Sequence, residues 1–340
     1  MKKILFATTL AVSLVIVLSA CKNPPIFAAI EQEVKLNPAS VKGRVRGIVK
    51  IGDTLYASNG KIWYKEKGKT GKWSEMKDCP PGLCTGLAVS GPNLYAAFEQ
   101  NDAFTIYWYD TGTPSSTWNN VSGLTAKAVF GTRMVFAVSK ESDTAYTIRV
   151  IAGGSPTSWS TGKFPVGAAR EYCLLEDGLY NKIGSKVAGS PTSGLRGICE
   201  GSVNAVFVFD NGKLYCYDGS SWTSISHGVA NPQSITYLPN KQLVLIGGIK
   251  GYGEIKLGSV SDTNLGNAKT VSAGSAESSV PSTNIHQYNN SIGKYVINPI
   301  NAFDHGAGGY IIYVGINDPN AKYTGLWGFY SPDRIEWNRE

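Results

Sequence analysis

The sequence predicts an all-β fold, a β-propeller of seven four-stranded blades, from three observations. Glycine contributes 39 of the 340 residues and aromatic residues 11%, whereas charged residues make up only 17%. This composition is typical of short strands joined by tight turns, and it excludes coiled coils, helical bundles and disordered chains. The second observation is a tryptophan that closes successive segments. The third is that no segment shows a sustained 3.6-residue apolar period, so we expect almost no helix.

Three consecutive segments, which begin at Gly47, Gly86 and Ala126, share one pattern. Each has a short apolar strand, a glycine-containing turn, a second strand such as LYA, an aromatic strand and a loop that ends in tryptophan. The closing tryptophans are Trp73, Trp118 and Trp159, which are 45 and 41 residues apart. This spacing is the period of four-stranded propeller blades. It argues against the alternative architecture, a pair of β-sandwiches.

The repeat continues more weakly through the rest of the chain. Residues 168–194 lack the tryptophan, the next unit ends at Trp222, the sixth again lacks it, and the last unit from Asn284 ends at Trp337. The count is therefore seven units, with six or eight blades as the alternatives. One small sheet cannot bury both of its faces, but a ring of sheets can. We expect each tryptophan to be structural and wedged against the next blade.

The N-terminus carries an export signal. Lys2 and Lys3 precede an uncharged apolar run, residues 4–18, which is short for a membrane span but typical of a secretory signal. Residues 18–21, Leu-Ser-Ala-Cys, resemble the lipobox of bacterial lipoproteins. The resemblance implies cleavage before Cys21 and acylation of that cysteine with diacylglycerol and palmitate-type chains. An ordinary signal peptide and an uncleaved anchor are the alternatives.

Three segments follow from this assignment: a signal peptide over residues 1–20, a lipidated tether over 21–43 and the propeller over 44–340. The formal net charge is +7, and the basic residues are spread along the chain. An exported protein with dispersed charge is not expected to bind nucleic acid. The small basic group Lys65, Lys67, Lys69 and Lys72 is expected to decorate a solvated hairpin.

Five cysteines remain once Cys21 is acylated. Cys79 and Cys84 bracket a Pro-Pro-Gly turn, and an exported protein can close such a loop as a disulfide. Cys173 and Cys199 are a second candidate pair, which leaves Cys216 unpaired. Zinc is the competing interpretation, but the three histidines are far apart in sequence, so no metal site is predicted. Phosphate-binding and dinucleotide-binding motifs are absent, and no cofactor is expected.

The closing segment SPDRIEW resembles the Asp-box turn of sialidase-like propellers. Ser331, Asp333 and Trp337 match that motif, whereas Arg334 stands where glycine is usual. In those families the turn lies between outer strands, so the resemblance implies a structural role for these residues. Together, the lipobox and the degenerate repeats are similar to surface lipoproteins of spirochaetes and other bacteria.

Catalytic residues are not assigned by the sequence. A glycan hydrolase on a sialidase-like ring, the first alternative function, needs three converging arginines and a Tyr–Glu pair. Arg170, Glu171, Tyr172 and Arg196 could face the central channel, although solvated strand ends are the simpler interpretation. The second alternative resembles the propeller lipoprotein that assembles outer-membrane barrels. The repeat A-x-D-x-x-T-G-x-x-x-W of that family is absent from this chain.

We therefore expect a non-catalytic binding or scaffold module for a protein or glycan, monomeric and lipid-anchored at the outer membrane or cell surface. Propellers suit this role because their loops vary freely on a rigid ring. The expected contact residues lie in the last unit: Asp304, His305, Trp327 and Tyr330. Core packing is the alternative role for Trp327 and Tyr330.

Overall fold

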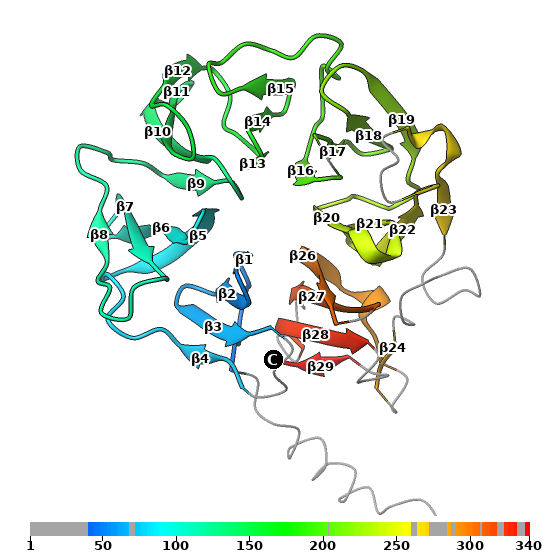
Figure 1. The fold of residues 1–340 in the computed structure, drawn as a ribbon, viewed down its shortest axis with the longest axis horizontal. Helices are drawn as coiled ribbons and strands as arrows, with labels where there is room; N and C mark the ends of the chain where they lie inside the picture. Colours follow the sequence, from blue (N-terminus) through cyan, green and yellow to red (C-terminus); the bar gives the residue numbers. More distant parts are fainter. Residues whose placement is uncertain are drawn as a thin grey trace, which may run out of the picture. The chain divides into compact units, whose positions relative to one another are not determined.

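The computed structural model describes residues 40–67, 72–202, 204–259, 264–271, 284–286, 290–306, 308–317, 323–331 and 337–340. They belong to one compact unit, Ser40–Glu340. Seven antiparallel sheets radiate from a central axis as the blades of a propeller (Figure 1). The predicted all-β propeller of seven blades is confirmed. Cys21 and most of the predicted tether lie outside the described residues.

The first three blades match the three clear sequence repeats. In chain order, the strands of each blade run from the axis outward. Their bounds are β1 Gly47–Ile51, β2 Thr54–Ser58, β3 Ile62–Glu66 and β4 Ser74–Glu75; β5 Leu83–Ser90, β6 Asn93–Gln100, β7 Ala103–Asp110 and β8 Asn119–Asn120; β9 Ala128–Phe130, β10 Val135–Ser142, β11 Ala145–Ala152 and β12 Ser158–Thr161.

The last four blades follow the weaker repeats. Their strands are β13 Gly167–Ala169, β14 Tyr172–Leu175 and β15 Gly178–Asn181; β16 Gly197–Glu200, β17 Val206–Phe209, β18 Lys213–Tyr217 and β19 Trp222–Ser226; β20 Ser234–Leu238, β21 Leu243–Gly248, β22 Gly251–Lys256 and β23 Lys269–Val271; β26 Val296–His305, β27 Gly309–Asn317, β28 Gly325–Ser331 and β29 Asn338–Arg339. A separate two-stranded sheet, β24 Asn284–His286 and β25 Asn290–Ser291, precedes blade 7.

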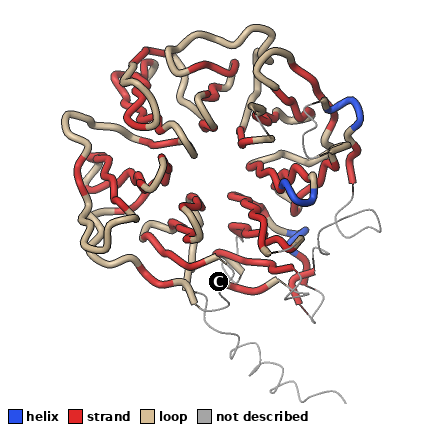
Figure 2. The backbone as a smooth tube through the Cα atoms, viewed as in Figure 1, coloured by secondary structure: helices blue, strands red, loops and turns tan. Residues whose placement is uncertain are grey.

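Helix is confined to three short 3-10 turns in the described part of the chain, as Figure 2 shows. They are η1 Pro239–Lys241, η2 Leu265–Asn267 and η3 Ile292–Lys294. This agrees with the lack of a helical apolar period in the sequence.

Blade 4 has three strands, and the chain covers its outer edge in another way. Tyr180 forms an isolated bridge with Lys186, and the backbone N–H of Val187 donates to the carbonyl of Leu179 at 2.8 Å. The hydroxyl of Ser190 accepts from the N–H of Leu179 at 2.8 Å. These bonds satisfy the edge of β15 without a regular fourth strand, which is why the repeat in this segment is weak.

The hydrophobic core is divided into seven clusters, one between each pair of neighbouring blades. Strand β17 shows how the sequence builds them. Its four residues, Val-Phe-Val-Phe, are all buried because successive side chains point to opposite faces of the sheet. Val206 and Val208 pack toward blade 4, whereas Phe207 and Phe209 pack toward blade 6. A middle strand buried on both faces therefore reads as a continuous apolar run.

The repeat tryptophans are wedged between blades, but not in the expected direction. Trp118, Trp222 and Trp337 pack against the blade that precedes their own in the chain, and Trp73 of blade 1 packs against blade 7, its neighbour on the same side around the ring. Only Trp159 packs against the following blade, where its ring stacks on Tyr180 at 5.5 Å between centroids. The prediction that each tryptophan faces the next blade is therefore correct for Trp159 alone. Sequence spacing gives the period, whereas the side chosen depends on strand register.

Blades 7 and 1 meet at a seam that holds a buried ion pair. Lys65 on β3 donates to the carboxylate of Glu340 and to the hydroxyl of Tyr330, the latter at 2.8 Å. The indole N–H of Trp73 donates to the same carboxylate at 2.9 Å. Backbone bonds join Val41 to Glu340 and to Leu326 at 3.0 and 3.1 Å. The ring is thus closed by polar contacts as well as by apolar packing.

Candidate functional site

A cavity of about 500 Å³ lies where the innermost strands converge. It is lined by residues of β1, β13, β16, β20 and β26, together with nearby turns. Because every blade repeats the same inside-to-outside order, its innermost strand ends at the same mouth of the ring. We call this the strand-end mouth. Lys50, Glu200 and Asp304 line the cavity at the ends of β1, β16 and β26.

Two lysines form the cationic side of the cavity. Lys50 and Lys67 both line the cavity; Lys50 is exposed to solvent and Lys67 is half-buried. Burial, followed by the charge of Lys67, lowers the pKa of Lys50, while Asp53 and Asp304 act in the opposite direction. The ammonium of Lys67 lies 3.5 Å from the carboxylate of Asp53, whose side chain is 87% exposed.

The acidic side chains across the cavity have their own partners. Glu200 accepts hydrogen bonds from the hydroxyl of Thr132 at 2.9 Å and from the guanidinium of Arg133 at 3.0 Å. Asp304 accepts from the backbone N–H of Asn240 at 3.1 Å. Burial, followed by the negative charge of Asp304, raises the pKa of Tyr237 to about 12, so this wall of the cavity carries a neutral phenol. The lining of the cavity therefore contains hydrogen-bonded carboxylates as well as lysines.

The arginines that could have formed a sialidase-like centre are separated. Arg170 lies in the turn after β13, at the strand-end mouth, and reaches Asn204 at 3.4 Å. Arg196 precedes β16 at the opposite mouth, where it binds Asn231 at 2.6 Å and lines a different cavity of about 660 Å³. Within the described residues, the candidates from the sequence thus do not converge on one anion. Tyr172 packs edge-on against Tyr217.

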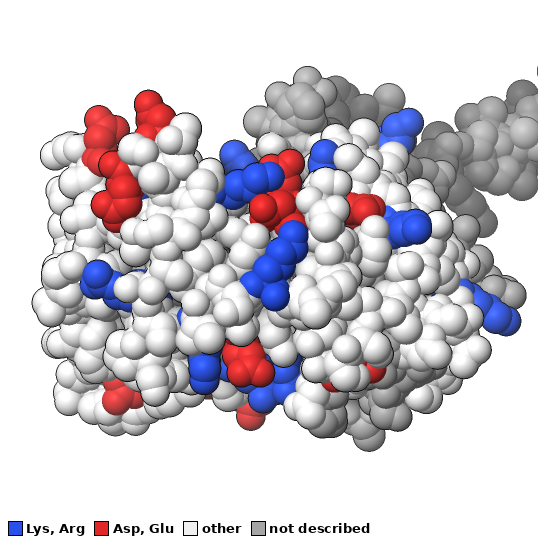
Figure 3. Space-filling view, turned by 90° about the horizontal axis from the view of Figure 1, so that it is seen from above, with Lys and Arg blue, Asp and Glu red and all other residues white. Residues whose placement is uncertain are grey.

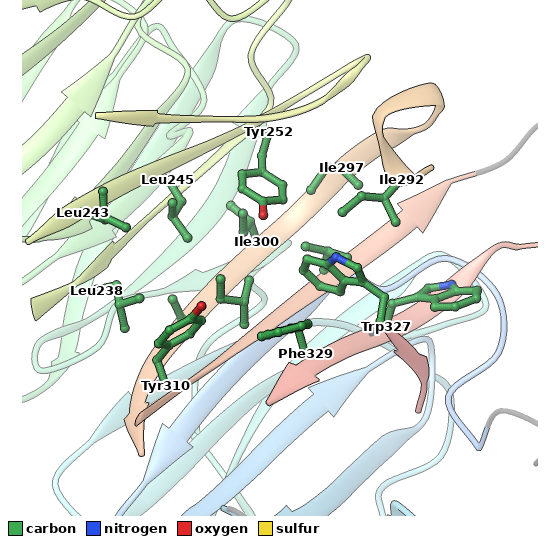
Figure 4. Close-up of a cluster of buried hydrophobic side chains, with 14 of the residues drawn as sticks. Leu238, Leu243, Leu245, Tyr252, Ile292, Ile297, Ile300, Tyr310, Trp327 and Phe329 are labelled. Carbon is green, nitrogen blue, oxygen red and sulfur yellow. The ribbon is translucent and has the colours of Figure 1, made fainter. Parts of the chain in front are cut away.

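The four expected contact residues of the last unit divide into two groups. Asp304 lines the cavity, and His305 follows it as the last residue of β26. Trp327 and Tyr330 are only 2% and 0% exposed, so the proposed surface role for these two is wrong. Figure 4 shows Trp327 among apolar side chains such as Ile292 and Phe329. Strand β28 is buried on both faces, and its aromatics fill the cores on either side of blade 7.

The basic group at residues 65–72 does not form one solvated surface. Lys65 is 5% exposed and belongs to the seam between blades 7 and 1. Lys67 lines the central cavity, whereas Lys72 is exposed. Lys69 lies outside the described residues. The expectation of a solvated hairpin is therefore wrong for Lys65, which binds the carboxylate of Glu340, and for Lys67, which lines the cavity. The sequence pattern reveals neither environment.

The first predicted disulfide is not formed, since Cys79 and Cys84 are free thiols in this structure. Both contact the core between blades 1 and 2. The Sγ of Cys79 donates to the carbonyl of Met76 at 3.3 Å, and that of Cys84 to the carbonyl of Gly86 at 3.6 Å. Burial raises the pKa of each thiol to about 11. These thiols resist ionisation and do not resemble activated nucleophiles.

The second predicted pairing is also wrong. Cys173 lies in the core between blades 3 and 4, whereas Cys199 borders the core between blades 5 and 6. Two cysteines in different cores cannot approach to disulfide distance without moving whole blades. Each thiol is kept neutral by burial, which raises its pKa well above the ordinary value.

The Asp-box resemblance is only partly covered by the structure. Ser331 ends β28, and Trp337 is buried against Tyr252 and Phe329, in keeping with a structural role. Asp333 lies outside the described residues. The described residues contain no group of three or more His, Cys, Asp or Glu side chains that could hold a metal ion.

Charge on the outside of the propeller is mixed. Figure 3, a quarter turn from the view along the axis, shows basic and acidic side chains interspersed over the visible face. Nor does the described part of the chain contain a helix long and apolar enough to span a bilayer. The visible face carries no large patch of one charge, whereas charged side chains from several blades meet at the central cavity.

The fold and the cavity define a seven-bladed propeller with a polar axial site. A solved chain described as the structure of U3-55K is similar to it, with a TM-score of 0.50 and 14% identity over 83% of this chain and 90% of that one. That likeness shows the fold alone. The chain itself belongs to the TP013X lipoprotein family, whose profile matches residues 2–340.

The chain is also similar to proteins of Treponema pallidum (strain Nichols). One, described as an uncharacterized lipoprotein, is 28% identical over 95% of this chain and 93% of its own length. A second with the same description is 27% identical over 95% of this chain and 94% of its own length. The resemblance to bacterial lipoproteins inferred from the sequence is thus confirmed.

Proposed function

We propose that this protein is a lipid-anchored, non-catalytic binding or scaffold module of the cell envelope, located at the outer membrane or cell surface. It presents the strand-end mouth to a protein or a glycan. The observation that carries the proposal is the axial cavity, whose mouth gathers charged side chains from blades 1, 5 and 7. A ring with a purely structural role would not need a group of charged side chains at the ends of its innermost strands.

Anchoring rests on the lipobox-like end of the signal, Leu18 to Cys21, and on membership of a lipoprotein family. Several acyl chains on Cys21 would hold the domain at a bilayer almost permanently, since each buried CH₂ contributes about 0.8 kcal/mol. Cells that express wild type should incorporate radiolabelled palmitate into the protein, and Cys21→Ser should not. Equal labelling of the two would contradict anchoring at Cys21.

A second, smaller hollow at the strand-end mouth supports the binding role. Arg133, Arg170, Glu171 and Lys182 line a smaller hollow of about 300 Å³, formed by the turns that follow β9, β13 and β15. Turns at this mouth can vary without disturbing the cores between blades, which is the usual arrangement for recognition on a rigid scaffold. Glu171 is exposed, so it is available to a partner.

Crosslinking on intact cells tests this role. Full-length wild type should capture a defined envelope protein or glycan, and Glu171→Lys should reduce that capture by about tenfold, the loss of one interfacial charge contact. Lys163→Glu, which changes an exposed charge at the opposite mouth, is the matched control and should capture normally. Equal loss in both variants, or no capture by wild type, would overturn the proposal. Turnover of a glycan by the purified protein would instead favour the hydrolase.

A further inference from the structure

The chain enters the propeller at the opposite mouth, where the innermost strands begin. Lys42 forms an isolated bridge with Gly325, the first residue of β28, and Gly325 lies level with Ile297 near the start of β26. Cys21, the proposed site of acylation, precedes Val41 by 20 positions, so the chain between them spans at most about 70 Å. The link to the proposed lipid anchor therefore leaves the propeller from this mouth.

Exposed basic side chains surround the entry point. Lys42, Arg44 and Arg46 are exposed ahead of β1, and Lys77 is exposed in the connection from blade 1 to blade 2. Within the described part of the chain, none of these four side chains forms an ion pair. Their charges are therefore available to an anionic surface.

An exposed apolar side chain lies beside the same entry point. Leu83, the first residue of β5, is 53% exposed, and the N–H of the next residue, Cys84, donates to the carbonyl of Gly60 at 2.8 Å. The neighbour of Gly60 in the turn between β2 and β3 is Asn59, whose side-chain amide donates to the carbonyl of Lys42 at 2.6 Å. This turn thus holds the entry segment and Leu83 close to each other.

Basic side chains outnumber acidic ones in this part of the mouth. Segments 40–46, 59–61 and 75–83, together with Glu99 opposite Leu83, contain five basic and three acidic side chains. One of the acids, Glu75, is already paired with Lys61 at 2.7 Å. We call the following five residues the entry patch: Lys42, Arg44, Arg46, Lys77 and Leu83.

The opposite mouth also carries most of the exposed large apolar side chains. Among the described residues there are five of these, and three of them, Leu83, Phe164 and Val166, lie just before or at the start of an innermost strand. Phe164 and Val166 are 38% and 37% exposed. Apolar area together with basic charge on one face is the combination that holds a protein surface on an anionic bilayer.

We propose that the opposite mouth docks on the anionic surface of the bilayer that holds the acyl chains of Cys21, with the entry patch against the lipid headgroups. The strand-end mouth then faces away from the bilayer, toward a partner. The anchor keeps the entry patch at a high effective concentration near the lipid, so weak individual contacts are sufficient. This inference rests on the proposed function, because it requires the anchor.

Hydrogen–deuterium exchange on the full acylated chain tests docking in vesicles of two compositions. One is phosphatidylcholine alone, and the other is an equal mixture of phosphatidylcholine and phosphatidylglycerol. We expect residues 42–46 and 77–83 to exchange more slowly on the anionic vesicles, because docking excludes water from them. The turn 170–171, at the strand-end mouth, should exchange equally on both.

Two substitutions locate the contact. Arg44→Gln should weaken docking by about fivefold, the contribution of one basic side chain near anionic lipid. Leu83→Ser should weaken it by about fivefold or more, because an apolar side chain no longer enters the interface. Docking of Arg44→Gln is read from residues 77–83 and docking of Leu83→Ser from residues 42–46, so that neither readout contains the substituted position.

Matched controls lie at the strand-end mouth. Ile183→Ser changes an apolar side chain that is 60% exposed after β15, and Lys72→Gln changes an exposed cation between β3 and β4. Both should dock like wild type. Equal exchange of the entry patch on the two vesicles, slower exchange at 170–171 instead, or equal docking by Leu83→Ser and Ile183→Ser would overturn the proposal. Palmitate labelling scores the anchor separately, so equal exchange in a labelled chain removes docking and leaves anchoring standing.

Discussion

Lys65 and Glu340 form a buried ion pair across the seam between blade 1 and blade 7, and their side chains are only 3% and 4% exposed. The carboxylate also accepts from the indole of Trp73, and the ammonium donates to Tyr330. The hydroxyl of Tyr330 in turn lies 2.5 Å from that of Tyr313. Burial, reinforced by Tyr313 and Glu340, raises the pKa of Tyr330 far above its ordinary value, so the phenol stays neutral.

Breaking this pair should destabilise the ring strongly. Glu340→Gln leaves the ammonium of Lys65 buried without a counter-charge, which typically costs about 3–5 kcal/mol. Lys61→Met is the matched control, because it removes the pair between Lys61 and Glu75, whose side chains are 63% and 44% exposed. Such a surface pair is worth about 1 kcal/mol or less. Urea unfolding curves compare the two, and equal losses would show that the seam pair contributes no more than a surface one.

Gly184 should be a position where even alanine is not tolerated. Its φ of +82° is unfavourable for any residue with a side chain, and a Cβ there would lie 2.6 Å from the ring of Trp159. Gly184→Ala should cost roughly 2–4 kcal/mol, the backbone penalty plus overpacking. Gly194→Ala is the control, since its φ is +70° but a Cβ there would contact nothing within 4 Å. Thermal melts should show the smaller loss for Gly194→Ala; the reverse order would contradict the described packing of Trp159.

Asp218 should contribute to stability in a pH-dependent way. The backbone N–H groups of Ser221 and Ser220, and then their hydroxyls, hold the pKa of this exposed carboxyl well below its ordinary value of about 4. A depressed folded-state pKa means that the contribution is present above the unfolded pKa and is lost as pH falls. The melting temperatures of wild type and Asp218→Asn should therefore differ at pH 7, and the difference should narrow progressively as pH falls below about 4. A difference that is constant with pH would show that the carboxylate charge is irrelevant.

The thiols of Cys79 and Cys84 should react slowly in the folded protein. A pKa raised from 9.0 to about 11 lowers the thiolate fraction at pH 8 by about 100-fold, and burial further limits access. Iodoacetamide labelling followed by mass spectrometry should modify both cysteines quickly only after unfolding in urea. If the unfolded, unreduced protein instead lacks both thiols, the disulfide predicted from the sequence is formed in solution.

Much of the fold could be predicted because each blade repeats the same local chemistry. The tryptophan spacing of 45 and 41 residues gave the blade period, and the apolar runs gave the buried middle strands. The opposite packing directions of Trp118 and Trp159 could not be predicted, because one residue of register decides which face of the sheet a side chain occupies. The three-stranded form of blade 4 could not be predicted either, because irregular backbone around Val187 and Ser190 forms the hydrogen bonds that a fourth strand would make.

Of the contact residues expected from the sequence, Asp304 lines the cavity, whereas Trp327 of the same unit is in the core. Lys50 and Lys67 are 17 positions apart, and they both line the cavity because β1 and the turn after β3 lie at the same mouth of the ring. Lys65 and Lys67 also look equivalent in sequence. Lys65 is buried in the seam and Lys67 lines the cavity, and this difference depends on blade 7, whose residues lie far along the chain.

The seam has a consequence for how the molecule is made. Lys65 and Glu340 are 275 residues apart, so blade 1 is synthesised long before the residues that complete its outer core. Until blade 7 has been synthesised, Trp73 and Leu55 lack their packing partners from that blade, and an apolar face of blade 1 is exposed to solvent. Contacts of such long range form late and slowly. A newly made chain should therefore depend on chaperones until its ring closes, and the first blade to emerge should be the last to become resistant to proteases.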